Sequence, residues 1–168
     1  MKNIWILVIL FTMPVLTFGQ NTIDFQPGIE IVDLKKQPGY DAPLSLRFVF
    51  NGQVELRKHY ENLKKHITKQ FSITDVKLEF EINLADSQEM ESSSQPEAIC
   101  TIEINDIQAL EEELEEIRRQ RYSLAFSVHN TRTHSIQLEG QYNIKSLDHI
   151  GTQNRNVAEE LFMAILSR

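Results

Sequence analysis

Polar and apolar residues alternate along five short stretches of the chain. In the first of them, Leu46, Phe48 and Phe50 alternate with Arg47 and Val49. A period of two residues is typical of a β-strand that buries one face and exposes the other. The sequence therefore predicts five such strands, at 44–50, 76–84, 98–104, 122–128 and 136–144.

Three other stretches space their apolar residues three or four positions apart, which is the period of an amphipathic helix. We expect these helices at 53–70, at 105–121 and from about 156 to the end of the chain. The second and third begin on candidate capping boxes, in which the side chains of two residues three apart bond each other's backbone N–H groups. These pairs are Asn105 with Gln108, and Asn156 with Glu159.

The first two predicted helices carry opposite charges. Five lysines and arginines of 53–70 outnumber its two glutamates, whereas six acids of 105–121 outnumber its three arginines. Side by side on a sheet, the two helices would attract each other, although exposed pairs contribute only about 0–1 kcal/mol each. Solvated helix faces are the plainer interpretation of both charge runs, and a partner site is the alternative.

Two segments lack strong periodicity. The segment 20–43 holds a short apolar run at 29–34 between two Pro-Gly turn signals, and it is either a first edge strand or a loosely held arm. The segment 85–97 is polar and serine-rich, and it predicts a long mobile loop within one domain.

From residue 44 the predicted order is strand, helix, strand, strand, helix, strand, followed by one more strand and helix. The first six elements have the split βαβ order of a ferredoxin-like domain. The expected class is therefore α+β: a two-layer α/β sandwich with a ferredoxin-like core, an added β-hairpin strand and a C-terminal helix. This order also resembles small periplasmic α/β domains of envelope machinery, such as the amino-terminal domain of the Tol system's propeller protein. No site residue follows from that resemblance.

The first 19 residues have the pattern of a cleavable secretory signal peptide. Lys2 precedes an apolar run, and small residues follow at Thr17 and Gly19. The run is about 15 residues long and contains Pro14, so it is shorter than the roughly 20 residues that cross a bilayer. Cleavage would leave Gln20 first and a single domain at 44–168, free in the periplasm or outside the cell.

Composition and charge narrow the possible partners. The chain has 41% hydrophobic and 24% charged residues, as compact domains do, and its net charge is −7. An acidic exported protein is a poor candidate for binding nucleic acid or an anionic membrane. Cys100 is the single cysteine, so no intrachain disulfide forms, and we expect it to be a buried apolar residue.

The five histidines do not have the spacing of a metal site. His59 and His66 are seven apart on one predicted helix, and His129 and His134 flank the predicted hairpin turn. Neither arrangement matches a metalloprotease or zinc pattern. We interpret them as surface histidines, with a weak adventitious metal site between His129 and His134 as the alternative.

No catalytic or cofactor motif is present either. The chain lacks the G-x-S-x-G elbow of a serine hydrolase and every glycine-rich phosphate loop. The outward faces of the last two strands carry no aromatic residues on which bases would stack; they hold Ser123, Ala125, Ser127, Gln137 and Gln141. Acids that alternate with core residues are best explained as solvated strand residues; these are Glu79, Glu81, Glu103 and Glu139.

The sequence thus predicts no catalytic, cofactor-binding or metal-binding residue and no cofactor. We expect an exported, soluble, non-enzymatic binding or assembly module of the bacterial envelope or secretome. Its partner would be another envelope or secreted protein, bound through the polar sheet face, the loop or an open strand edge. A secreted inhibitor, propeptide-like or chaperone domain is the alternative, and a small enzyme without a recognisable motif comes third. The oligomeric state stays open.

Overall fold

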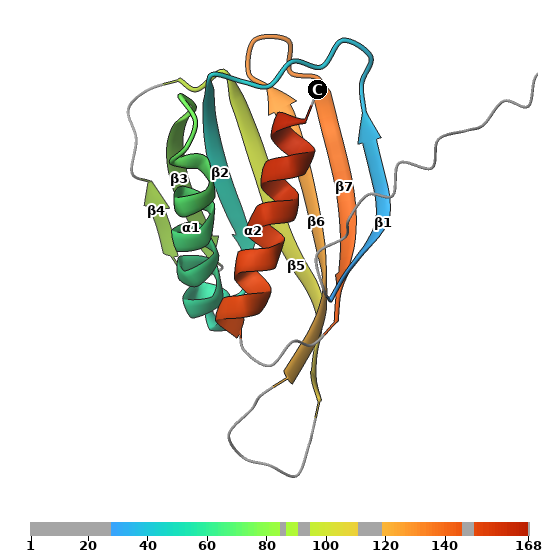
Figure 1. Ribbon diagram of the computed structural model, residues 1–168. Coiled ribbons are helices and arrows are strands. Elements are labelled where there is room, and N and C mark those ends of the chain that lie inside the picture. Colours follow the sequence, from blue (N-terminus) through green and yellow to red (C-terminus); the bar gives the residue numbers. More distant parts are fainter. Residues whose placement is uncertain (1–27, 85–86, 91–94, 111–118, 146–149, 168) are drawn as a thin grey trace, which may run out of the picture.

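The computed structural model describes residues 28–84, 87–90, 95–110, 119–145 and 150–167. Within these residues, seven strands form one sheet in the order β1-β7-β6-β5-β2-β3-β4. Figure 1 shows the two α-helices side by side across one face of that sheet. The strands are β1 (Ile29–Lys36), β2 (Ser45–Gly52), β3 (Lys77–Leu84), β4 (Ser87–Met90), β5 (Ala98–Leu110), β6 (Arg119–Asn130) and β7 (Ile136–Ile144). The helices are α1 (Arg57–Phe71), preceded by a 3-10 turn η1 (Val54–Leu56), and α2 (Ile150–Leu166).

The α+β class is confirmed, but the sheet is not that of a plain ferredoxin-like split βαβ domain. β2 lies in the middle of the sheet and pairs in parallel with both β3 and β5. From β5 onward the chain continues as an antiparallel meander through β6 and β7, and β1 pairs with β7 at the far edge. The prediction failed at its second helix, which does not separate β5 from β6.

The segment predicted as the helix 105–121 is extended wherever the structure describes it. β5 runs on to Leu110, β6 begins at Arg119, and Gln108 pairs with Arg121 across the two strands. A bulge between Asn105 and Gln108 takes the place of the predicted capping box. Figure 1 shows this ribbon of β5 and β6 continuing beyond the ends of the other strands. The residues between them, 111–118, lie outside the described part of the chain.

Two other predictions are corrected at strands. Residues 87–90, predicted as part of a mobile loop, form the edge strand β4 against β3; the adjoining 85–86 and 91–94 lie outside the described residues. In the N-terminal arm, the edge-strand alternative is right, because Ile29–Lys36 pairs along β7. The remaining predicted strands and the β6–β7 hairpin are confirmed.

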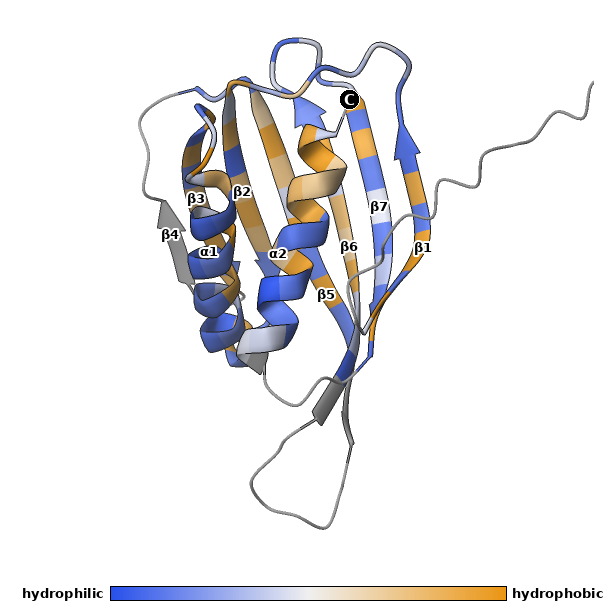
Figure 2. Ribbon diagram, in the orientation of Figure 1, coloured by the Kyte–Doolittle hydropathy of each residue, from blue (hydrophilic) through white to orange (hydrophobic). Residues whose placement is uncertain are grey.

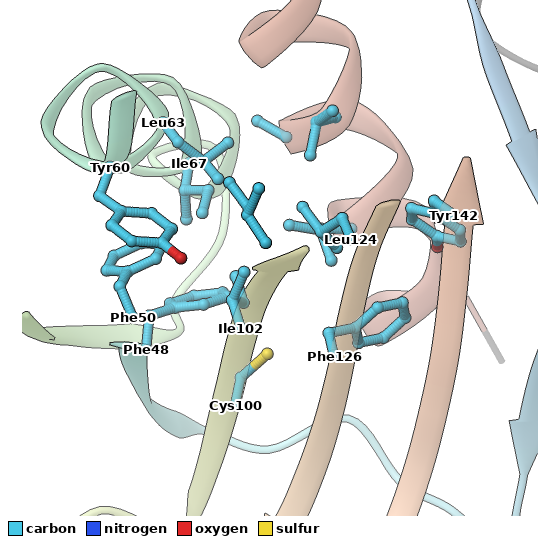
Figure 3. Packing of buried hydrophobic residues seen from close by; sticks show 14 of the residues in the cluster. Phe48, Phe50, Tyr60, Leu63, Ile67, Cys100, Ile102, Leu124, Phe126 and Tyr142 are labelled. Carbon is cyan, nitrogen blue, oxygen red and sulfur yellow. The ribbon is translucent and has the colours of Figure 1, made fainter. Parts of the chain in front are cut away.

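The core lies between the sheet and the helices. Figure 2 shows the apolar residues of the strands alternating with polar ones, as a sheet with one covered face requires. Phe48, Phe50 and Leu124 are fully buried from the strands, and Leu63 and Ile67 meet them from α1 (Figure 3). Cys100 is buried among them as predicted, and it is a free thiol.

The two helices pack against each other along their length. The rings of Phe71 in α1 and Phe162 in α2 meet edge to face, with centroids 5.1 Å apart. A hydrogen bond from Gln70 Nε2 to Glu159 Oε1 joins the helices nearby. The buried stripe predicted for the last helix is confirmed: Val157, Leu161, Ala164 and Ile165 are all in the core.

The last helix starts earlier than predicted. It is already formed at Ile150, so Asn156 lies inside the helix, where it is buried, and is not an N-cap. The predicted signal peptide, 1–19, lies outside the described residues. Among the helices of the described part of the chain, none is both long and apolar enough to span a membrane.

Candidate functional site

The sheet face opposite the helices is a polar surface on which the structure brings distant segments together, and we call it the open face. Alternate residues of six strands point to it. The β6–β7 register sets Ser123, Ala125 and Ser127 opposite Asn143, Gln141 and Glu139. β1 adds Asp33 and Lys35 beside β7, and β5 adds Thr101 and Glu103 beside β6.

A hollow of about 440 Å³ lies in this face over β1, β7, β6 and β5. Its floor is made of small side chains, including Thr101, Ala125 and Ser127, and its sides carry charged ones. Small residues in the middle of a sheet face leave room for another surface to come close to the backbone. The hollow is lined by three carboxylates and one ammonium group: Asp33, Glu103, Glu139 and Lys35.

The charges of the open face are partly paired. Lys35 Nζ lies 2.6 Å from Asp33 Oδ2 and 3.5 Å from Glu139 Oε1. The hydrogen bond that Lys35 donates to Asp33, followed by the charges of Asp33 and Glu139, raises the pKa of Lys35. Further along the sheet, Arg47 donates to Glu79 Oε2 from Nε at 3.0 Å and from Nη2 at 2.9 Å. Glu103 stays exposed, so the hollow keeps a negative excess.

The open edge at β1 is a poorer contact surface than the open face. A register shift between Ile31 and Asp33 interrupts the strand, and Lys35 and Lys36 follow it. Bulges and lysines are the features that keep edge strands from pairing with another chain. Val32 and Leu34 are exposed on this edge, but the interrupted strand offers no long regular ladder.

One pair on the open face has the chemistry of a nucleophile and a base. Ser127 Oγ lies 3.0 Å from His129 Nε2, because residues two apart on a strand point to the same side. A serine hydrolase also needs backbone N–H groups aimed at the developing oxyanion. Ser127 itself pairs with Thr101 of β5 and with Glu139 of β7, and the register against β7 shifts between Val128 and His129. This contact was not predicted, although Ser127 and His129 are two residues apart on a predicted strand, a spacing that indicates it.

A second group of polar atoms is buried between the helices and the sheet. The His59 ring meets that of Tyr122 edge to face at 5.1 Å. Asn154 Nδ2 donates to the His59 carbonyl oxygen at 3.3 Å and to Asn62 Oδ1 at 3.0 Å. His59 Nε2, the Tyr122 hydroxyl and Asn154 Oδ1 have no hydrogen-bond partner in the described structure. Burial lowers the pKa of His59 to about 4.

The histidines therefore differ in their surroundings more than the sequence predicted. His59 is only 6% exposed, so its interpretation as a surface residue was wrong. His134 is exposed in the hairpin turn, and the register sets His129 opposite Ile136. Within the described residues, no group of three or more metal-ligating side chains comes together. Burial raises the pKa of the Cys100 thiol far above its ordinary range, so the thiol stays protonated.

The predicted strand acids lie on the open face as expected, with different exposures. Glu103 is exposed and Glu139 partly so, whereas Glu79 is sheltered by its ion pair with Arg47. Glu81 is only 9% exposed, so its interpretation as a solvated strand residue was wrong. Of these four acids, Glu103 and Glu139 share the hollow.

Comparison with solved structures shows the fold. The chain is similar to PelC from Paraburkholderia phytofirmans, a dodecamer, with a TM-score of 0.58 and 4% identical residues. The alignment covers 83% of this chain and 99% of the PelC chain. A single-residue variant of the PelC dodecamer gives a TM-score of 0.54 over the same shares. At 4% identity this likeness concerns the fold alone.

A hemagglutinin homolog from Helicobacter pylori, described as neuraminyllactose-binding, aligns with a TM-score of 0.38, too low to establish a common fold. Its alignment has 8% identity and covers 79% of this chain and 88% of that one. No protein-family model matches the chain, and no curated protein sequence does.

Proposed function

We propose that this protein is an exported, non-catalytic binding or assembly module of the bacterial envelope or secretome, and that it makes its contacts through the open face. The observation that carries the proposal is the hollow of that face. Side chains from four strands meet there over a floor of small residues, and neither helix covers them.

Two further observations support contact over catalysis. The Ser127–His129 pair lies on an interior strand that pairs on both sides, where ladder hydrogen bonds compete for the backbone donors that an oxyanion needs. The fold is also that of PelC, which is a dodecamer, so a protein of this architecture is known to associate with copies of itself. A polar face that is open to solvent suits recognition better than catalysis, because catalytic sites usually exclude water from the reacting groups.

The test is affinity capture from an envelope extract with the exported chain as bait. Ala125→Arg places a long charged side chain on the half-buried floor of the hollow, and Ser135→Arg adds the same side chain in the exposed hairpin turn. We expect the unchanged chain and Ser135→Arg to retain one partner in stoichiometric amount, and Ala125→Arg to lose it. The melting temperatures of the two variants are the control for folding, and both should stay close to that of the unchanged chain.

Three results would contradict the proposal. Equal capture by both variants would remove the open face from the interaction. Stoichiometric capture of a protease that the chain inhibits would favour the inhibitor alternative. Covalent labelling of Ser127 by a serine-reactive fluorophosphonate, abolished in Ser127→Ala, would show a catalytic serine.

A further inference from the structure

The solvent-facing side of the helices has a positive net charge, opposite in sign to that of the hollow in the open face. We call this surface the helix layer and define it by the outward residues of α1 and α2. Four cations on it, Lys58, Lys65, Lys69 and Arg155, outnumber two carboxylates, Glu61 and Glu159. Figure 2 shows the outer side of α1 as almost wholly hydrophilic.

His66 of α1 lies close enough to these cations for their charges to act on its ring. Burial lowers the pKa of His66, and the positive charges of Lys65, Lys69 and Arg155 lower it further. Glu159 acts in the opposite direction but is the smallest of these influences. Cations from both helices therefore act together at one place.

The hollow of the open face has the complementary sign on the other side of the same sheet. Its hollow holds the carboxylates of Asp33, Glu103 and Glu139 against the single ammonium group of Lys35. The small floor residues let the ends of long side chains approach these carboxylates. Figure 1 shows that the helices cover one face of the sheet, and the acidic hollow lies in the other. The basic helix layer and the acidic hollow therefore point in opposite directions.

From this arrangement we infer that the partner of the open face is a second copy of this chain, which docks its helix layer there, head to tail. The inference rests on the proposed function and names its partner. Two open faces placed together would bring like carboxylates into contact, and two helix layers would bring like cations together. A head-to-tail contact leaves one free face at each end, so it repeats, and it closes into a ring when its rotation allows.

The expected contact is modest and sensitive to salt. The six strands of the open face, about 4.8 Å apart and about seven residues long, give roughly 700 Å² of projected face, of which two helices cover only a part. A contact over about 500 Å² on each side would bury about 1,000 Å², at the low end of specific interfaces. The screening length falls from about 10 Å at 0.1 M salt to about 3 Å at 1 M, so the assembly should dissociate as salt is added.

The test uses two charge-reversed variants and their mixture. The helix variant carries Lys58→Glu and Lys65→Glu, and the face variant carries Glu103→Lys and Glu139→Lys. The helix variant then has two acidic surfaces and the face variant two basic ones, so neither should assemble alone. In a one-to-one mixture, the acidic helix layer of the first fits the basic face of the second, and the original contact fits as well. If Glu139→Lys lowers the melting temperature, Glu103→Lys combined with Gln141→Lys, at an exposed position of the same hollow, serves as the face variant.

Light scattering on a size-exclusion column reads the mass of each sample at about 50 mM and about 500 mM salt. We expect multiples of the chain mass at low salt for the unchanged chain and for the mixture, and single chains for each variant. A single-chain mass of the unchanged protein at low salt, normal assembly of either variant, or no recovery in the mixture would overturn the inference. If the captured partner is a different protein and Ala125→Arg still loses it, the proposed function stands and the inference of a second copy is wrong.

Discussion

The imidazole of His59 is buried under the first turn of α1 in contact with the ring of Tyr122, and burial keeps its pKa near 4. An unfolded chain binds a proton at this residue below about pH 6.5, whereas the folded chain does not until about pH 4. Folding stability contributed by neutral His59 is therefore fully present near pH 7 and is lost as the pH falls toward 4.

We predict that His59→Phe removes part of this pH dependence. The unchanged chain should lose about 2–3 kcal/mol of unfolding free energy through His59 between pH 7 and pH 4.5, because one pKa unit corresponds to about 1.4 kcal/mol. Denaturant unfolding at the two pH values measures the loss. His134→Asn, in the exposed turn, is the matched control and should keep the full slope. An unchanged slope in His59→Phe would contradict the assigned burial.

For single residues, the sequence predicted burial well on the strands and less well on the helices. Alternation fixes which face each strand residue takes, so Cys100 and the inward residues of β2 were assigned correctly. His59 was missed although it lies three residues after Leu56 and four before Leu63, both buried, which places it on the inner side of α1. Its polar side chain concealed that position, where it contacts the ring of Tyr122. Ser127 and His129 were each assigned to the surface, and their mutual contact escaped notice.

Among the elements, β5 and β6 show how pairing overrides a helical pattern. The apolar spacing of 105–121 suits a helix, but β5 has a complete antiparallel partner in β6 from Ala98 onward. Extending that ladder past Asn105 needs one bulge, where Asp106 takes a φ of 54° and accepts a hydrogen bond from Ser123. Aspartate tolerates this backbone conformation better than most residues do. The helical prediction failed because local propensity cannot reveal a partner strand.

We predict that NMR chemical shifts will show this ribbon directly. The Cα and Cβ shifts of residues 108–110 and 119–121 should have the deviations of a β-strand, because these residues pair with each other. Residues 60–67 of α1 serve as the internal helical reference. Helical deviations at 108–110 would contradict the ribbon and restore the helix that the sequence pattern favours.

On the scale of the whole molecule, the fold gives the sheet one covered and one uncovered face. Because α1 and α2 both pack on the same side, their basic outer surface and the acidic hollow point in opposite directions. The sequence predicted a polar sheet face and charged helices. It did not predict the acidic hollow opposite the basic helix layer, because Asp33, Glu103 and Glu139 lie on separate strands whose order in the sheet no local pattern gives.

Radical footprinting of side chains tests most directly whether these two faces meet. Met163 on the outer side of α2 is 58% exposed, and Ile136 at the hollow is 42% exposed, while Leu44, at 73%, lies in neither surface. On passing from high to low salt, the oxidation of Met163 and Ile136 should fall several-fold together, and that of Leu44 should not change. Protection of only one of the two, or of neither while the particle grows in mass, would contradict a head-to-tail contact between the helix layer and the open face.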